Sequence, residues 1–276
     1  MESNAQKTFT LFGAICLMVM LPGAVQAQTC GSILTANTTL SANLVCPLGN
    51  GLVLAANNIS LDCDGYTITG GGSGIGILLD NVRSATVANC RVDGFGVGFR
   101  IDGGSHNSLL DNIALNNQST LGGFHIINES TNNWLERNIS AFNVVGRGFS
   151  VDGSDLNVLL ENVAYENGFR GFDIINSSNG LLYDNAAVNN WSAGIVVQDY
   201  LGGTSTGNSL LANYIEASGS EGLAMFASGN TVEWLISDNN GTWGIRDTSS
   251  GPANTYTSNT CAGNPSGTSS PLGLCF

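Results

Sequence analysis

The chain has 276 residues, and its formal net charge of −13 comes from 21 acidic and only 8 basic residues. Charged residues are just 11% of the sequence, with 37 glycines and 5 prolines, which argues against a disordered chain and against a helical bundle. A chain this acidic, without a basic patch, is not expected to bind nucleic acid or an anionic membrane.

Residues 1–27 differ from the rest of the chain. Lys7 precedes an apolar run at residues 9–21, and residues 24–27 read Ala-Val-Gln-Ala. This order is typical of a secretory signal peptide, and the apolar run is too short for a comfortable membrane span. We expect cleavage after Ala27, a secreted or periplasmic product, and no membrane insertion. The cleavage would remove one acid and one base, so the net charge stays at −13.

Residues 28–276 are predicted to form a single domain, with an N-terminal cap at 28–50, coils at 51–260 and a C-terminal cap at 261–276. Six cysteines remain after cleavage, and an even number in an exported chain suggests disulfides. We pair Cys30 with Cys46 and Cys261 with Cys275 within the caps, and Cys63 with Cys90 between neighbouring coils. Spacing alone leaves other pairings open.

A glycine followed by an apolar residue, any residue and a second apolar residue recurs along the chain. Successive glycines are 22 to 28 residues apart, a period that indicates a stacked repeat. The copies begin at Gly76, Gly98, Gly123, Gly148, Gly171, Gly194 and Gly222, with a decayed copy at Gly244.

Asparagines recur with the same period, each after a short apolar stretch. Asparagine tolerates the left-handed backbone of a sharp turn, and its amide can bond the equivalent residue in the next coil. We expect three short strands per coil and about nine or ten coils, which at roughly 4.8 Å per coil gives a rod of about 45 Å. One ladder runs through Asn89, Asn112, Asn138, Asn162, Asn185, Asn213 and Asn259, and a second through Asn117, Asn143, Asn167, Asn190, Ser218, Asn240 and Asn264.

Two coils carry insertions, at residues 118–121 and 198–207. Because the ladders continue on both sides, the extra residues must bulge outward as loops. Such loops often rim the binding face of a solenoid, although a tolerated surface loop is an equally good interpretation.

The chain resembles the right-handed parallel β-helix repeat family of the pectate-lyase-like superfamily. The resemblance implies an all-β, right-handed parallel β-helix with coils of about 22–28 residues. It implies less about chemistry, because the family includes lyases, hydrolases, epimerases, binding modules and adhesins. It rests on Cys30-Gly31, on residues 40–46, on Leu-Asp-Cys-Asp-Gly-Tyr-Thr-Ile-Thr-Gly at residues 61–70, and on the repeats through Asn259.

One branch of this family, the NosD type, is often described as copper-binding. Copper sites use histidine, cysteine and methionine. After cleavage this chain has only two histidines, His106 and His125, and one methionine, Met225, at an inward position. We therefore expect neither a metal nor another cofactor.

In a β-helix the variable residue of each glycine motif faces outward, so these residues form a row. The row reads Leu78, Arg100, His125, Ser150, Asp173, Val196, Ala224 and Arg246. Asp102 and Asp152 lie in a parallel row two positions on, and Arg147 and Arg170 directly precede their glycines.

This strip is the candidate site. A polymer of acidic sugars needs arginines to pair its carboxylates, and a lyase or epimerase needs a base to remove a proton from carbon. We assign the catalytic role to His125, with Asp173 second, and substrate binding to Arg100, Asp102, Arg147, Asp152 and Arg170. The competing interpretation is a set of solvated residues with ion pairs between coils.

The sequence thus favours a secreted β-helix that binds extracellular or cell-wall polysaccharide. One alternative is a polysaccharide lyase, epimerase or hydrolase that acts on acidic glycans through the strip. The other is a structural or adhesive surface protein. The sequence does not indicate an oligomeric state.

Overall fold

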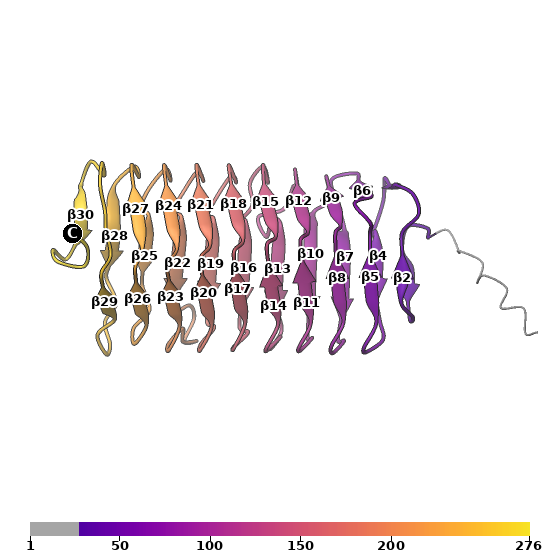
Figure 1. Ribbon diagram of the computed structural model, residues 1–276, viewed down its shortest axis with the longest axis horizontal. Coiled ribbons are helices and arrows are strands. Elements are labelled where there is room, and N and C mark those ends of the chain that lie inside the picture. Colours follow the sequence, from indigo (N-terminus) through magenta and orange to yellow (C-terminus); the bar gives the residue numbers. More distant parts are fainter. Residues whose placement is uncertain (1–27) are drawn as a thin grey trace, which may run out of the picture.

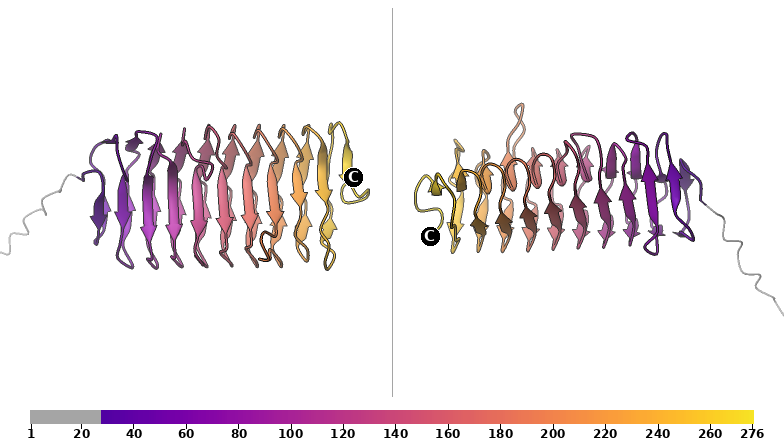
Figure 2. Two further views of the ribbon diagram at one scale, coloured as in Figure 1. Left: turned by 180° about the vertical axis from the view of Figure 1, so that it is seen from behind. Right: turned by 90° about the horizontal axis from the view of Figure 1, so that it is seen from above.

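The protein is a right-handed solenoid of about ten rungs, seen along its side in the computed structural model, which describes residues 28–276 (Figure 1). Within this range the chain is built of strands and turns, and each rung adds one strand to each of three parallel sheets. The views from behind and from above show the same stacking along the rod (Figure 2). The predicted fold class is confirmed. The expected signal peptide lies outside the described residues.

Sheet A has 11 strands and contains the glycine motifs. Each motif places its glycine at the entry of a strand, where a side chain would strike the next rung: a Cβ on Gly148 would lie 2.5 Å from the carbonyl oxygen of Gly171. The strands are β1 (Ser32–Leu34), β4 (Leu52–Leu54), β7 (Ile75–Asp80), β10 (Val97–Asp102), β13 (Phe124–Ile127), β16 (Phe149–Asp152), β19 (Phe172–Ile175), β22 (Ile195–Gln198), β25 (Leu223–Met225), β28 (Trp243–Asp247) and β30 (Gly267–Ser270).

Sheet B follows sheet A in each rung and has 10 strands. Its strands bury a single central residue and turn the two flanking residues outward, as the period of two in a β-strand requires. They are β2 (Thr38–Thr39), β5 (Ser60–Asp62), β8 (Thr86–Ala88), β11 (Ser108–Leu110), β14 (Trp134–Glu136), β17 (Val158–Leu160), β20 (Leu181–Tyr183), β23 (Ser209–Leu211), β26 (Thr231–Glu233) and β29 (Thr255–Thr257).

Sheet C completes the rung with 9 strands, and its chain then turns back into sheet A. The turn between sheets B and C holds the first asparagine ladder, and the turn between sheets C and A holds the second. The strands are β3 (Leu44–Cys46), β6 (Thr67–Gly70), β9 (Arg91–Asp93), β12 (Ile113–Leu115), β15 (Ile139–Ala141), β18 (Val163–Tyr165), β21 (Ala186–Val188), β24 (Tyr214–Glu216) and β27 (Ile236–Asp238).

The core is a set of like side chains stacked along the axis. Four phenylalanines of sheet A illustrate this, because the sheet pairs them in direct register. Their rings are nearly parallel, and adjacent centroids are 4.6 to 4.8 Å apart, the spacing of the strands themselves. The four are Phe99, Phe124, Phe149 and Phe172.

The asparagine ladders form as predicted from Asn112 onward. The side-chain oxygen of Asn162 accepts the backbone N–H and the side-chain N–H of Asn138, both at 2.9 Å, while its own amide donates to Leu135 and Asn185. The buried turns are therefore satisfied by the rungs on either side.

The assignment of Asn89 to the first ladder is wrong. Asn89 is exposed with a φ of 55°, and the ladder place is taken by Cys90, whose N–H donates to Asn112 at 3.0 Å. Cys90 is tied to the preceding rung by its disulfide, which replaces the amide contact between those rungs.

A third ladder, not predicted, lies at the turn between sheets A and B. Its amides bond in the same way, for example Asn107 to Asn133 and Asn133 to Asn157. The spacing in the sequence carried this signal. The ladder passes through Asn107, Asn133, Asn157, Asn208, Asn230 and Asn254, with Gly180 in one rung.

All three predicted disulfides are present: Cys30–Cys46, Cys63–Cys90 and Cys261–Cys275. Residues 28–50, expected as a cap, also supply the first strand of each sheet, since β1, β2 and β3 pair with β4, β5 and β6. Among residues 28–276 there is no helix of the length and hydropathy needed to cross a membrane.

Candidate functional site

The candidate strip lies on the outer face of sheet A, and its predicted rows are confirmed. Arg100 of β10 pairs with His125 of β13, which pairs with Ser150 of β16, which pairs with Asp173 of β19. In the parallel row Asp102 pairs with Ile127. Neighbouring members of a row are thus one strand spacing apart, about 4.8 Å.

Although these side chains face away from the core, the middle of the row is not solvated. His125 is 5% exposed, and Asp173 is fully buried. The corner that leads from sheet C into sheet A covers Asp173, because Arg147 and Arg170 both contact its carboxylate and both lie against Phe169. The outer face therefore has a buried polar layer of its own.

Asp173 is the centre of this layer. Arg170 approaches both of its carboxylate oxygens, at 2.8 and 2.9 Å, and Arg147 donates to one of them through Nε. Gln198 of the next rung donates a further hydrogen bond at 2.9 Å. These four contacts occupy both carboxylate oxygens, so the negative charge of Asp173 serves to hold the two arginines.

Phe169 places the two guanidinium groups. The guanidinium carbon of Arg170 lies 4.8 Å from the centre of the Phe169 ring, and that of Arg147 lies 5.4 Å from it. Cations are attracted to aromatic faces at such distances. Each arginine retains N–H groups beyond those used on Asp173, and each side chain keeps 18% of its surface exposed.

His125 lies one rung from Arg147 and two rungs from Arg170. Burial and the positive charges of Arg100 and Arg147 lower the pKa of His125 to about 3, so the imidazole is neutral at ordinary pH. Its Nδ1 is buried and has no hydrogen-bond partner among residues 28–276. A neutral imidazole with a free nitrogen can accept a proton or a hydrogen bond.

Two hollows open on this face and share Asp152. The first, about 590 Å³, is lined by His125, Ile127, Asn128, Glu129, Asp152 and Gly153. Burial raises the pKa of Asp152, against the opposing effect of Arg147. The hollow thus combines a neutral base with carboxylates in a partly dry setting.

The second hollow, about 390 Å³, contains the arginine cluster. Leu121 and Tyr200 contribute to its wall, and they come from the two insertions at 118–121 and 198–207. Arg147 also donates to the carbonyl of Thr120 at 3.0 Å, which fixes the first insertion. Both loops therefore border the face on which the strip lies.

Arg100 and Asp102 lie at the N-terminal end of the strip and line neither hollow. Asp102 accepts a hydrogen bond from Asn128 at 2.6 Å, and Arg100 lies beside His125, its partner on the adjacent strand. The sequence did not single out Phe169, Asn128 or Glu129. Phe169 could have been recognised in the sequence, because it lies between the second ladder and Arg170. The equivalent position of the next rung is occupied by a small polar residue, Ser192.

Comparison with known proteins supports the fold. No family model matches the sequence, and no curated protein matches it. Among solved structures, the Dettilon tailspike protein superposes with a TM-score of 0.68 at 15% identity, over 83% of this chain and 52% of the tailspike. The protein shares the parallel β-helix fold of the tailspikes.

Other similar structures are epimerases. The periplasmic alginate epimerase AlgG gives a TM-score of 0.60 at 17% identity, over 83% of this chain and 61% of AlgG. The A-module of mannuronan C-5 epimerase AlgE4 from Azotobacter vinelandii gives 0.57 at 15%, over 87% and 88%. The chain spans only 52 to 61% of the tailspike and AlgG chains. At these identities the comparisons establish the fold.

Proposed function

We propose that this protein is exported and binds an extracellular acidic polysaccharide along the outer face of sheet A. The observation that carries the proposal is the Arg147–Arg170 pair, held by Asp173 and Phe169 on the wall of an open hollow. The two arginines there balance the carboxylates of Asp173 and Asp152, so the hollow is far less acidic than the rest of a chain whose net charge is −13. A carboxylate is the natural partner of the remaining guanidinium N–H groups.

The similar structures agree with a glycan partner. Two are named as alginate or mannuronan epimerases, and the tailspike of E. coli bacteriophage HK620 was solved in complex with a pentasaccharide. The three disulfides agree with an oxidising compartment, and the expected signal peptide would direct the chain to such a compartment. A sugar chain would run along the rod, because the hollows follow one another from rung to rung.

The test is binding to soluble polyuronates, with alginate and polygalacturonate as probes. Arg147→Gln and Arg170→Gln together should lower affinity at least about ten-fold, since a hydrogen bond to a charged group contributes about 1.5 to 3 kcal/mol. Arg246→Gln is the matched control, because this arginine belongs to sheet A but is exposed and paired with Glu221. Binding by the wild-type protein should weaken as the salt concentration rises. Equal binding by the double variant and the control would refute the proposal.

A second candidate is a lyase or epimerase acting at the same face. It is favoured by His125, whose neutral imidazole has an unpartnered nitrogen beside the arginines. A bound sugar carboxylate would offset the charges of Arg100 and Arg147 and so make His125 more basic. Asp173 would act by positioning the arginines, because its oxygens are already engaged.

This candidate has its own readout. A lyase would produce unsaturated uronates, which absorb in the ultraviolet, and an epimerase would exchange the C5 proton for solvent deuterium. His125→Gln should abolish either signal while binding persists. If the wild-type protein gives neither signal on the polymers it binds, the catalytic assignment is rejected and binding stands alone. If it binds no glycan, the structural or adhesive alternative replaces both.

A further inference from the structure

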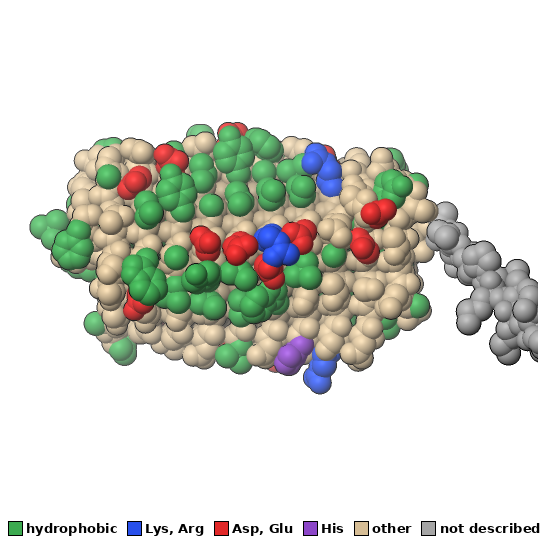
Figure 3. Space-filling view, viewed as in Figure 1, with side chains coloured by type: hydrophobic (Ala, Val, Ile, Leu, Met, Phe, Trp, Pro, Cys, Tyr) green, Lys and Arg blue, Asp and Glu red, His purple; other side chains and the backbone are tan. Residues whose placement is uncertain are grey.

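The face formed by sheets B and C, opposite the arginine cluster, has a different character. Its outward positions carry hydrophobic side chains in two bands, one over each sheet, and a row of charged side chains runs between them (Figure 3). In sheet B the partly buried aliphatic residues of this face are Leu110, Val158, Leu160, Leu181 and Leu211. They provide a dry floor on which larger side chains rest.

Three aromatic residues project from this face at intervals of two rungs, two from sheet B and the third from the turn that follows it. Trp134 belongs to β14, Tyr183 to β20, and Trp234 follows β26 directly. One strand of sheet B lies between each pair, so successive rings are two rungs apart, about 9.6 Å along the rod. Their exposed fractions are 40, 41 and 56%. Such values suit rings with one face packed and the other open.

The register adds a sideways step from ring to ring. Trp134 aligns through Val158 with Leu181, so Tyr183 lies two positions further along its strand. Tyr183 aligns through Leu211 with Glu233, so Trp234 lies one position further again. The three aromatic residues therefore follow a diagonal, with a step of about 12 Å from Trp134 to Tyr183 and of about 10 Å from Tyr183 to Trp234, on the scale of one disaccharide in an extended β-1,4-linked chain.

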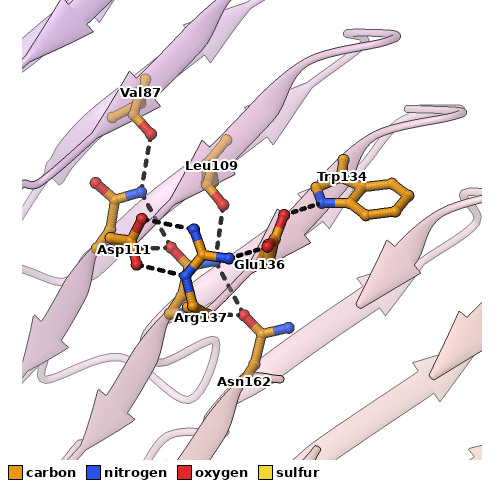
Figure 4. Close-up of polar contacts among 9 residues, drawn as sticks. Val87, Leu109, Asp111, Trp134, Glu136, Arg137 and Asn162 are labelled. Atoms are coloured by element: carbon orange, nitrogen blue, oxygen red, sulfur yellow. Dashed lines mark hydrogen bonds and ion pairs between the residues drawn. The ribbon is translucent and has the colours of Figure 1, made fainter. Parts of the chain in front are cut away.

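Trp134 is held in position by a chain of polar contacts (Figure 4). Its indole N–H donates to Glu136 at 2.8 Å, Glu136 is bound by Arg137, and Arg137 reaches both carboxylate oxygens of Asp111 at 2.8 and 2.9 Å. Exposed ion pairs contribute little to stability. What this network does is fix an exposed ring, and a ring fixed in advance loses less entropy when a ligand covers it.

The charges of this face select the ligand. Arg137 is accompanied by five acids, namely Asp111, Glu136, Glu161, Asp184 and Glu233. An acidic glycan or a nucleic acid would be repelled, and two copies of the chain would bring their acidic rows together. Flat aromatic faces at a disaccharide repeat suit the C–H faces of uncharged sugar rings. We propose that Trp134, Tyr183 and Trp234 form a binding platform for a neutral β-1,4-linked polysaccharide, separate from the sheet A site.

The test uses microcrystalline cellulose, chitin and β-mannan in sedimentation assays, and the matching hexasaccharides by calorimetry. We expect the wild-type protein to bind at least one of them, and Trp134→Ala and Trp234→Ala each to lower affinity about ten-fold, as for central aromatic contacts in other interfaces. Tyr183→Phe should retain binding and Tyr183→Ala should lose it. Trp191→Ala is the control, because Trp191 is 79% exposed but lies outside sheet B.

Glu136 is a positioning residue, and its variants separate orientation from folding. Glu136→Gln keeps an oxygen for the indole N–H and should bind as the wild type does, whereas Glu136→Ala should weaken binding several-fold at an unchanged circular dichroism spectrum. The proposal is overturned if no neutral polymer binds, if Trp191→Ala weakens binding as much as Trp134→Ala, or if sedimentation velocity shows a dimer that Trp134→Ala dissociates. None of these outcomes depends on polyuronate binding by sheet A.

Discussion

Arg170 approaches both carboxylate oxygens of Asp173, at 2.8 and 2.9 Å. From its outward position in the repeat, the sequence predicts that Asp173 is exposed to solvent, yet it is buried. The contact joins the corner of one rung to the strand that follows it, three residues on. A carboxylate with no solvent exposure is tolerable only because its partners are cations. Stability and any ligand binding on this face therefore depend on the same group.

Removal of the Asp173 carboxylate should be costly. Asp173→Ala leaves two arginines without their counter-ion and should lower the free energy of unfolding by about 3 to 5 kcal/mol, the cost of breaking a buried pair from one side. Urea denaturation followed by circular dichroism measures it. Asp111→Ala is the control, since that aspartate pairs with Arg137 on the exposed surface and should change the midpoint little.

Replacing a ladder asparagine should be costly for a different reason. In Asn162→Ala, the backbone N–H of Asn138 and the carbonyl of Leu135 lose their partners inside the turn. Each orphaned buried group costs about 1 to 3 kcal/mol, so we expect a loss of about 3 kcal/mol or more in chemical denaturation. Asn189→Gly should be near neutral, because Asn189 is exposed and its positive φ of 55° suits glycine. A near-neutral Asn162→Ala would contradict the ladder's role.

His125 should make the protein less stable in acid. Its pKa is 6.5 in the unfolded chain and about 3 in the folded one, because burial and Arg100 oppose its protonation. Below pH 6.5 the unfolded state takes up a proton that the folded state refuses, so stability present above that pH is lost as the pH falls toward 3. The slope is at most about 1.4 kcal/mol per pH unit. His125→Asn removes this term, so the difference in unfolding free energy between the two proteins should change over that window and level off above it.

The disulfide between the second and third rungs should matter more than the one at the C-terminus. Cys63→Ser with Cys90→Ser opens a loop with a sequence separation of 27, whereas Cys261 and Cys275 are 14 apart. Cross-links of this kind contribute about 2 to 4 kcal/mol, more for longer loops. The first double variant should lower the denaturation midpoint of the whole solenoid. The second should mainly speed amide exchange in β30, as measured by hydrogen–deuterium exchange.

The sequence by itself determined the architecture, because in a stacked repeat a residue's neighbour is found one period away along the chain. That arithmetic placed Arg100, His125, Ser150 and Asp173 in one row and paired Cys63 with Cys90, whereas the other two disulfides were predicted from their place in the end caps. It failed at Asn89, where the wrong one of two adjacent residues was assigned to the turn. It missed the third ladder, although the same spacing was there to read.

The tertiary structure alone decided what covers the rows. Coverage depends on how corners and insertions fold over a sheet, and that folding has no period: Phe169 lies against the two arginines that contact Asp173, and Tyr200 of the second insertion lines the same hollow. For the same reason the neutral state of His125 could not be read from its position in the row. The aromatic platform likewise needed the register of sheet B, because its residues occupy three different positions of the repeat. Contacts between equivalent positions of successive rungs can be predicted from the sequence spacing. Contacts between different positions of the repeat depend on three-dimensional packing, so only the structure shows them.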